Sequence, residues 1–271
     1  MDEQPLRFVS ISSEELYTRD NLVKNEQVVN ELHNLLINSS EAEEALRYLL
    51  DLRGLTRECI AQFKLGYLPR RLKIDGLAAV FNGRIVIPIF NAHGEVVGLS
   101  SRALDGCFPK YCHTQFKRNT VLYGLNLAKE FVIRKNLCYL VEGFFDVMSL
   151  WNLGVRNVVA TMGAGIDRLR ACLVYRYTSN VALIPDHDEA GNTGMMSIKK
   201  VLSSDPFNMK VFKVVYPDSY KDIDEYLRSS RTNQNNDFIK GLREAEGFKK
   251  HFIKDNLSEL LKDKMSKVLG V

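Results

Sequence analysis

Apolar residues recur with two different periods along this chain, and the change of period divides it into parts. Between Leu137 and about Leu227, short runs rich in β-branched residues alternate with stretches whose apolar positions have helical spacing. The apolar runs are LCYLV, NVVATM, NVALIP and KVFKVVYP. Buried strands that alternate with helices form parallel sheets with right-handed crossovers. The pattern predicts an α/β domain over residues 137–230.

The residues before position 137 have a different organisation. Up to about residue 80 the spacing is mostly helical, with capped helices predicted to start at Ser40 and Thr56 and to end at Gly54 and near Gly66. From Asn82 the runs RIVIPIF and EVVGLSS, joined by the turn-prone NAHG, predict a β-hairpin. Residues 105–121 are polar and basic and predict a loop. Residues 1–136 are therefore predicted to form a mixed α/β subdomain.

The residues after position 227 are mainly polar. The segment 228–236, RSSRTNQNN, is typical of a linker, and residues 237–271 have the spacing of one or two amphipathic helices. We therefore predict a short helical tail over residues 231–271.

Composition excludes some classes of protein. The longest apolar runs are strand-sized, far below the roughly 20 residues that span a bilayer, and the N-terminus has no signal-peptide pattern. We expect a cytoplasmic protein that does not bind membranes. The five cysteines are scattered, which fits a reducing compartment and predicts neither disulfides nor zinc in this chain. The group Cys107, Cys112 and His113 leaves a metal site open as the less favoured alternative to a loop with free thiols.

Acidic residues follow three of the predicted strands. In an open α/β sheet, ligands bind beyond the carboxyl ends of the strands. Carboxylates that converge there repel one another unless protonated or neutralised by cations, and Mg²⁺ and Mn²⁺ prefer oxygen ligands. The pattern predicts a divalent-metal site for phosphate chemistry, although a single aspartate after a strand is more often a helix cap. The candidate acids are Glu142, Asp146, Asp186, Asp188, Asp222 and Asp224, with Asp218 open between a turn and the site.

Charge is distributed unevenly. Residues 81–136 contain eight lysines and arginines and three acids, whereas residues 181–226 contain eight acids and five lysines. This distribution suits a polyanionic substrate that is held by the basic segment, including the 105–121 loop, and reacts at the acidic one. Solvated charged faces are the alternative.

Three acidic motifs resemble a known module. E-G-F-F-D-V (142–147), D-H-D-E-A-G (186–191) and D-I-D-E-Y-L (222–227) are similar to the Toprim module of bacterial replicative primases, topoisomerases and some nucleases. Upstream, segments 48–69, 83–104, 109–111 and 122–128 resemble, in order and spacing, the RNA-polymerase core of DnaG-type primases. The resemblance covers roughly residues 45–230. It implies an α/β fold, α+β overall, in which a Rossmann-like parallel sheet follows the mixed subdomain and precedes the helical tail.

The resemblance also implies an activity. It implies a nucleotidyltransferase, a DNA-directed RNA polymerase of primase type that makes short RNA primers on single-stranded DNA from NTPs with two or more Mg²⁺ or Mn²⁺ ions. Asp186, Asp188 and Asp222 match the family's metal positions, Asp224 is a fourth candidate ligand, and Glu142 matches its essential acid. Asp146 lies one helical turn from Glu142 and can support it or bind metal. The positions expected to bind nucleotide or template are Arg84, Arg102, Lys110, Lys117, Arg118 and Tyr111.

Some features depart from the family's pattern. His187 and Ile223 stand where glycine and proline are usual, and Ser100 and Ser101 replace a glycine pair. No zinc ribbon is recognised before the core and no helicase-binding domain after it. We therefore expect a separate zinc-binding template-recognition module and a replicative helicase as partners, and a phage or mobile-element origin. Two other functions stay open: a Toprim nuclease that uses the same metals, and a non-catalytic accessory that binds single strands.

Overall fold

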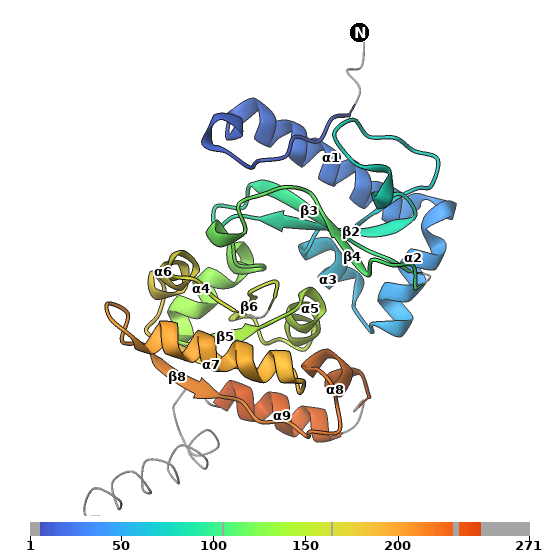
Figure 1. Cartoon of the computed structure of the whole chain (residues 1–271). Coiled ribbons are helices and arrows are strands. Elements are labelled where there is room, and N and C mark those ends of the chain that lie inside the picture. The colour runs from blue at the N-terminus through green and yellow to red at the C-terminus, as the bar shows by residue number, and fades with distance from the viewer. Residues whose placement is uncertain (1–5, 105, 164, 230–232, 245–271) are drawn as a thin grey trace, which may run out of the picture.

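Two four-stranded sheets organise the part of the chain that the structure describes. The structure is a computed structural model, and it describes residues 6–104, 106–163, 165–229 and 233–244. One sheet is antiparallel, with strand order β1-β2-β3-β4, and the other is parallel, with order β6-β5-β7-β8. Figure 1 shows the first sheet in the blue-to-green half of the molecule and the second in the yellow-to-orange half. The predicted α/β fold with a parallel sheet is confirmed.

The antiparallel sheet carries the long first helix on one face. Helix α1 (Arg19–Asn38) buries its apolar positions, including Leu32, and packs most closely where the chain has Gly66. A Cβ atom at Gly66 would lie 2.8 Å from the Leu32 Cβ, so only glycine permits this approach. The strands of the sheet are β1 (Gly66–Leu68), β2 (Arg84–Phe90), β3 (Val96–Arg102) and β4 (Tyr111–His113).

Short helices connect this sheet to the rest of the chain. Thr56 caps α3 through a hydrogen bond from the Cys59 amide at 3.2 Å, as the sequence predicts. The cap expected at Ser40 is instead supplied by Ser39, whose hydroxyl accepts from the Glu41 amide. The helical elements here are α2 (Glu43–Arg47), the π-helical turn η3 (Tyr48–Leu52), α3 (Arg57–Gln62), the 3-10 turn η5 (Arg118–Thr120) and α4 (Leu125–Lys135).

The parallel sheet places its acid-bearing ends together. Its central strands pair in register, Leu140 of β5 with Leu183 of β7, and the four residues of each strand are buried. Since the strands run the same way, the residues that follow β5 and β7 emerge at one edge. The elements are β5 (Cys138–Val141), α5 (Phe144–Asn152), β6 (Val158–Ala160), α6 (Arg168–Tyr175), β7 (Asn180–Leu183), α7 (Glu189–Ser203), β8 (Lys210–Lys213), α8 (Ile223–Ser229) and α9 (Asn233–Glu244).

The two parts share one core. The backbone of Tyr123 pairs with that of Ala160, with N···O distances of 2.9 and 3.0 Å, so the segment before α4 continues the parallel sheet beyond β6. Tyr123 is buried, and its ring stacks on Phe63 with centroids 5.7 Å apart. It is thus a packed aromatic residue of the core.

Three local predictions differ from the structure. The helix expected to run to about Gly66 ends at Gln62, and the strand β1 follows it. Within the loop predicted over 105–121, Tyr111–His113 pairs with β3. Helix α9 begins at Asn233, inside the predicted linker. Three-residue strands are too short to show a period in the sequence, because main-chain hydrogen bonds to a neighbour define them. The tail beyond residue 244 lies outside the described residues.

The sequence also predicts that no segment spans a membrane. Among the described residues, no helix combines the length and apolar character needed to cross a bilayer.

Candidate active site

Five of the predicted acids line one pocket at the carboxyl edge of the parallel sheet. Glu142 directly follows β5, and Asp186 lies on the turn after β7. The pocket has a volume of about 290 Å³ and opens between this edge and strands β3 and β4. Its acidic lining consists of Glu142, Asp146, Asp186, Asp222 and Asp224.

These carboxylates repel one another. Burial raises the pKa of Asp186 to about 7, and the charges of Glu142, Asp222 and Asp188 add to the effect. Burial and the charge of Asp188 also raise the pKa of Glu142. Asp146 is almost fully buried, and its pKa is raised well above the usual range by burial and by the neighbouring aspartates. A cation among these groups would relieve the repulsion.

The donor set fits a magnesium or manganese ion that is shared with substrate. Within the described ranges, no three histidine, cysteine, aspartate or glutamate side chains lie close enough to form a complete metal site. Mg²⁺ usually keeps several waters and uses one or two carboxylates together with substrate phosphates, so a complete protein cage is not required. Glu142 and Asp186 follow neighbouring strands and both line the pocket, so they could supply carboxylate oxygens to such an ion.

Asp188 and Asp222 both accept a helix-capping hydrogen bond. Asp188 Oδ1 accepts from the Gly191 amide at 2.7 Å at the start of α7, and Asp222 Oδ1 accepts from the Glu225 amide at 2.8 Å at the start of α8. Asp222 also lines the pocket, whereas Asp188 does not. The charge of Asp188 nevertheless raises the pKa of both Glu142 and Asp186, so it contributes to the field of the site.

Gly191 fixes the position of Asp186. A Cβ atom at Gly191 would lie 2.5 Å from the Asp186 carbonyl oxygen, which is closer than any side chain permits. The glycine therefore allows the first turn of α7 to pack directly on the backbone that carries this carboxylate.

His187 joins two of the acidic loops. Its backbone amide donates to the Lys221 carbonyl at 2.8 Å, and its Nδ1 lies 2.9 Å from the Tyr220 carbonyl. Its ring stacks on Tyr216 with centroids 4.0 Å apart, and its Nε2 lies 3.5 Å from the exposed carboxylate of Asp218. The turn that carries Asp186 is thereby attached to the loop that leads to Asp222.

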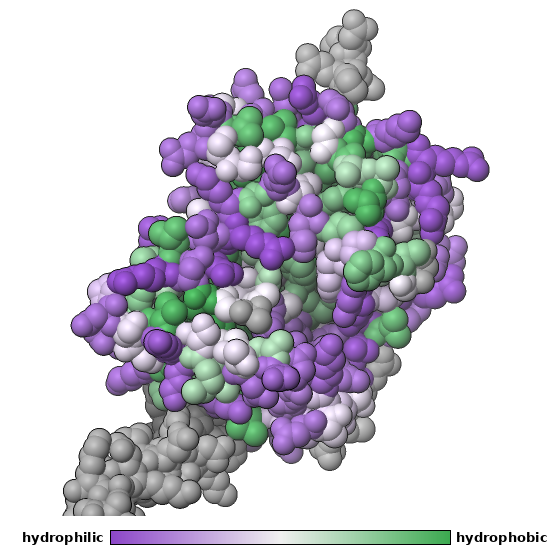
Figure 2. Space-filling model, viewed as in Figure 1, coloured by the Kyte–Doolittle hydropathy of each residue, from purple (hydrophilic) through white to green (hydrophobic). Residues whose placement is uncertain are grey.

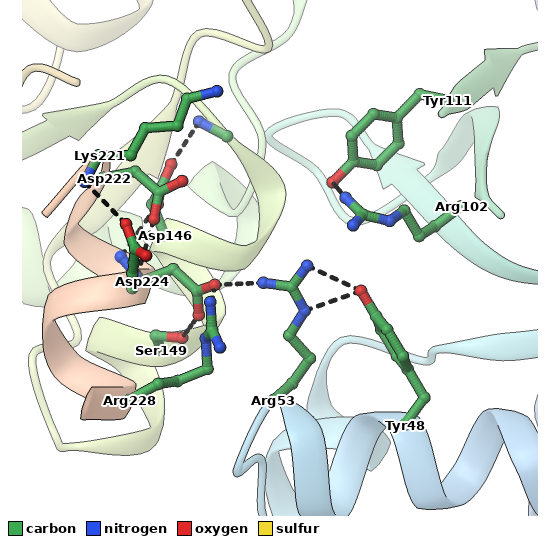
Figure 3. Close-up of polar contacts among 12 residues, drawn as sticks. Tyr48, Arg53, Arg102, Tyr111, Asp146, Ser149, Lys221, Asp222, Asp224 and Arg228 are labelled. Carbon is green, nitrogen blue, oxygen red and sulfur yellow. Dashed lines mark hydrogen bonds and ion pairs between the residues drawn. The ribbon is translucent and has the colours of Figure 1, made fainter. Parts of the chain in front are cut away.

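Asp224 lies in a buried ion network (Figure 3). Its Oδ2 accepts from Arg53 and, at 3.0 Å, from Arg228 Nε, while its Oδ1 accepts from Ser149 Oγ at 2.5 Å. The side chain of Asp224 is 3% exposed and that of Arg53 is 11% exposed. Both carboxylate oxygens therefore have protein donors, and the network connects η3 with α5 and α8. The prediction that Asp224 binds metal stays a prediction.

Asp146 is held by backbone amides. The Gly143 amide donates to its Oδ2 at 2.9 Å, and the Asp224 amide donates to its Oδ1 at 3.3 Å. The carboxylate thus connects the start of α5 to the start of α8, beneath the pocket.

Arg102, Lys110 and Tyr111 form the opposite wall. Figure 3 shows Arg102 and Tyr111 across from the acidic residues, with Arg102 Nη1 donating to the Tyr111 hydroxyl at 2.8 Å. The Arg102 guanidinium also lies over the Tyr111 ring, 5.0 Å from its centroid. Lys110 is exposed, and burial and the charge of Arg102 lower its pKa. All three residues line the pocket, so this wall places two cations opposite the carboxylates, and Arg53 and Lys221 line the same pocket.

The three remaining predicted cations lie elsewhere. Arg84 is buried and donates to the Pro109 carbonyl at 2.8 Å. Lys117 is exposed and lines a separate cavity together with Tyr17 and Arg176. Arg118 is exposed on η5, near enough to His113 to lower the pKa of that imidazole. The structure does not bring these three side chains into the acidic pocket.

The sequence did not identify several residues of the pocket. Arg53 was interpreted only as the end of a helix, and its partner Asp224 is 171 positions away. Lys221 precedes Asp222, and its charge lowers the pKa of Asp186. The position of Lys221 next to an acidic motif could have indicated that it lies in the pocket. No local signal distinguishes Arg53 from an ordinary arginine near a helix end.

Two family models match most of the region that carries these features. The model described as Toprim-like matches residues 139–227, and the model described as DNA primase catalytic core, N-terminal domain, matches residues 70–129. The N-terminal match ends at residue 129, within α4, and the Toprim-like match starts at residue 139, within β5.

Similar proteins are DNA primases. The chain is 32% identical over 222 residues to the DNA primase of Clostridium acetobutylicum, covering 71% of this chain and 36% of that protein. The corresponding values for the DNA primase of Aquifex aeolicus are 31%, 71% and 43%. A crystal structure of Aquifex aeolicus primase, described as its zinc-binding and RNA-polymerase domains, matches with a TM-score of 0.69 and 27% identity, over 84% of this chain and 63% of that one.

The matches define what part of such proteins this chain represents. It spans less than half of the length of these two curated relatives. The residues matched by the two family models include the predicted acids and Arg102, Lys110 and Tyr111 of the pocket. The chain therefore belongs to the family of DnaG-type primase catalytic cores.

Proposed function

We propose that this chain is the catalytic core of a DNA primase, a nucleotidyltransferase that joins NTPs into short RNA primers on single-stranded DNA. The observation that carries the proposal is the pocket in which a carboxylate cluster faces Arg102 and Lys110. A nucleotidyl-transfer site needs carboxylates for metal ions and cations for phosphates within one small volume. The relatives named DNA primase support the same activity.

The acidic edge is proposed to hold the metal ions. Glu142, Asp186 and Asp222 supply oxygen ligands from three different segments, and Asp146 supports them from below. Divalent ions bound there would lower the pKa of the attacking 3′-hydroxyl and neutralise charge on the reacting and leaving phosphates. We propose that Asp188 and Asp224 add negative charge to the site and help to fix the positions of α7 and α8. The sequence also predicts that both bind metal.

The basic wall is proposed to bind phosphates. Arg102 presents a planar guanidinium that the Tyr111 hydroxyl holds in place, which suits bidentate contact with phosphate oxygens. Lys110 adds a point charge at the rim. Burial and the charge of Arg102 lower the pKa of Lys110, and a bound phosphate would act in the opposite direction, because an anion stabilises the charged form.

The basic residues and the proposed activity also indicate which partners the chain binds. A single-stranded DNA template would reach the pocket across Arg102 and Lys110, and Arg118 and Lys117 would extend the basic surface outside it. Arg84 contributes by supporting the loop that carries Lys110. A zinc-binding module and a replicative helicase are proposed as protein partners in the bacterial cytoplasm. A phage or mobile-element origin remains our expectation from the sequence.

Primer synthesis on a defined template tests the proposal. Purified protein is incubated with single-stranded DNA, labelled NTPs and Mn²⁺, with and without a separately expressed primase zinc-binding domain. We expect labelled oligoribonucleotides whose formation requires template and metal. Cleavage of the DNA in the absence of NTPs would identify a nuclease instead. Binding of the strand without synthesis or cleavage under any of these conditions would identify a non-catalytic accessory.

A further inference from the structure

One aromatic side chain near the pocket is almost fully exposed. Phe108 has 95% of its surface open to solvent, whereas the next most exposed large apolar residue of the described part, Met196, has 62%. An apolar ring in water is unfavourable, and a well-ordered exposed aromatic is a common feature of binding surfaces.

Hydrogen bonds on both sides of Phe108 hold its loop in place. The loop connects β3 to β4, and the Ala103 amide donates to the Lys110 carbonyl at 3.1 Å, which closes its base. The buried guanidinium of Arg84 donates to the carbonyl of Pro109, the residue next to Phe108. The backbone next to the exposed ring is therefore held in place by the fold.

The loop starts at the basic wall of the pocket. Arg102 and Tyr111 pair across β3 and β4 at the point where the loop leaves the sheet, and both line the pocket. Lys110, two residues after Phe108, lines it as well. An exposed aromatic ring on a loop that connects two cations provides the groups with which proteins bind single nucleic-acid strands, because bases stack on such rings while phosphates contact the cations.

We propose that Phe108 stacks on a base of the single strand whose phosphates contact Arg102 and Lys110. The inference rests on the proposed function, and it adds a residue outside the motifs that suggested that function. Since every base has a flat face, the contact is sequence-tolerant. The stacking contact would hold the strand at the rim of the pocket whichever base lies on the ring.

A protein partner fits Phe108 less well. Protein interfaces are built from contiguous apolar patches, and none of the other large exposed apolar residues of the described chain belongs to this loop. On the face shown in Figure 2, hydrophobic residues form small groups that hydrophilic residues separate.

A tryptophan placed at position 108 reports stacking directly. The chain contains one tryptophan, the buried Trp151, so F108W adds an exposed fluorophore. Titration with a short thymidine homopolymer should quench this fluorescence saturably, with an affinity within about threefold of the wild type, since stacking is retained. M196W, at an exposed position on α7, is the matched control and should show no saturable quenching.

Alanine variants separate stacking from charge. F108A should weaken strand binding roughly 5- to 100-fold without changing the dependence of affinity on salt. K110A should lower the slope of log affinity against log salt by about one, because one phosphate contact is lost. F108L, which keeps an apolar side chain but has no ring, should resemble F108A.

The outcomes distinguish this inference from the proposed function. If the wild type binds the strand but F108A binds equally well, or if F108W is not quenched on binding, Phe108 does not stack and the inference fails while the primase proposal stands. If F108A impairs synthesis only when a protein partner is present and leaves strand binding unchanged, Phe108 is a protein contact and the inference is equally overturned. If the wild type binds no single strand, the proposed function itself fails.

Discussion

The acidic and basic walls of the pocket are built in different ways. The acids follow strands of one parallel sheet or the loops next to them, so the topology of the sheet gathers Glu142 and Asp186 at one edge. The cations come from the antiparallel sheet, from its β3–β4 loop and from the residue that follows η3, and their environments differ. Arg53 is paired with Asp224 and Arg84 supports a loop, whereas Arg102 and Lys110 face the pocket.

This difference in construction indicates which charged side chains are available to bind a ligand. The raised pKa of Asp186 reflects burial and neighbouring carboxylates whose charge Lys221 offsets only in part, which is a condition that favours metal binding. Arg53 is less available for a ligand, because the buried carboxylate of Asp224 already balances its charge. Substitutions at the acidic edge should therefore affect activity, and substitutions in the Arg53–Asp224 pair should affect stability.

The largest effect is expected from removing a carboxylate of the acidic edge. Asp186→Asn should lower primer synthesis by a factor on the order of a thousand or more, because a metal ligand supplies several kcal/mol of transition-state stabilisation. Synthesis rates and circular dichroism of the variant measure activity and folding separately. Activity close to that of the wild type would show that this carboxylate is not required.

Breaking the Arg53–Asp224 pair should affect stability. Arg53→Met leaves the buried Asp224 with Arg228 alone, and we expect a loss of roughly 3 kcal/mol in the free energy of unfolding, measured in urea. The control is Arg47→Met, which removes an exposed pair with Glu43 and should cost about 0.5 kcal/mol or less. Equal losses in both variants would mean that the buried network has no special role.

The pH dependence of stability tests the repulsion among the acids. The pKa of Asp186 is about 7 in the folded protein and 3.8 in the reference state, so the folded state binds the proton more tightly. This group's contribution to stability is present below pH 4 and is lost as pH rises towards 7. Without metal, the melting temperature should fall by a few degrees between pH 5 and pH 8, and Mn²⁺ should reverse the fall. Asp186→Asn should flatten the profile, and an unchanged slope would contradict the assignment.

A smaller effect is expected at His187. His187→Gly removes the contacts with the Tyr220 carbonyl and with Tyr216, so the loop to Asp222 is held less firmly. The Mn²⁺ concentration that gives half-maximal synthesis should rise roughly threefold to tenfold, which corresponds to about 1 kcal/mol. His187→Asn, whose amide can donate to the same carbonyl, should restore much of the loss. A lower maximal rate at unchanged metal dependence would assign His187 a different role.

The sequence predicted the acidic edge better than the basic wall for a physical reason. A strand and the residue after it are local features, so Glu142 and Asp186 could be assigned to one edge once the parallel sheet was predicted. The role of an arginine depends on its partners in space. Arg53 and Asp224 are 171 positions apart, and nothing in the local pattern indicates that they pair. For the same reason, burial of Arg84 became visible only in the structure, and only the structure shows that Asp188 has the capping role that the sequence left open.

Calorimetric titration of Mn²⁺ tests the central claim, that the acidic edge binds metal and the basic wall does not take part in that binding. Wild-type protein, Asp186→Asn and Arg102→Ala are compared at pH 8, above the pKa of about 7 of Asp186. We predict that the wild type binds Mn²⁺, that Asp186→Asn weakens binding at least about tenfold, and that Arg102→Ala leaves it unchanged. Absence of Mn²⁺ binding to the wild type, or equal affinity in Asp186→Asn, would contradict the account.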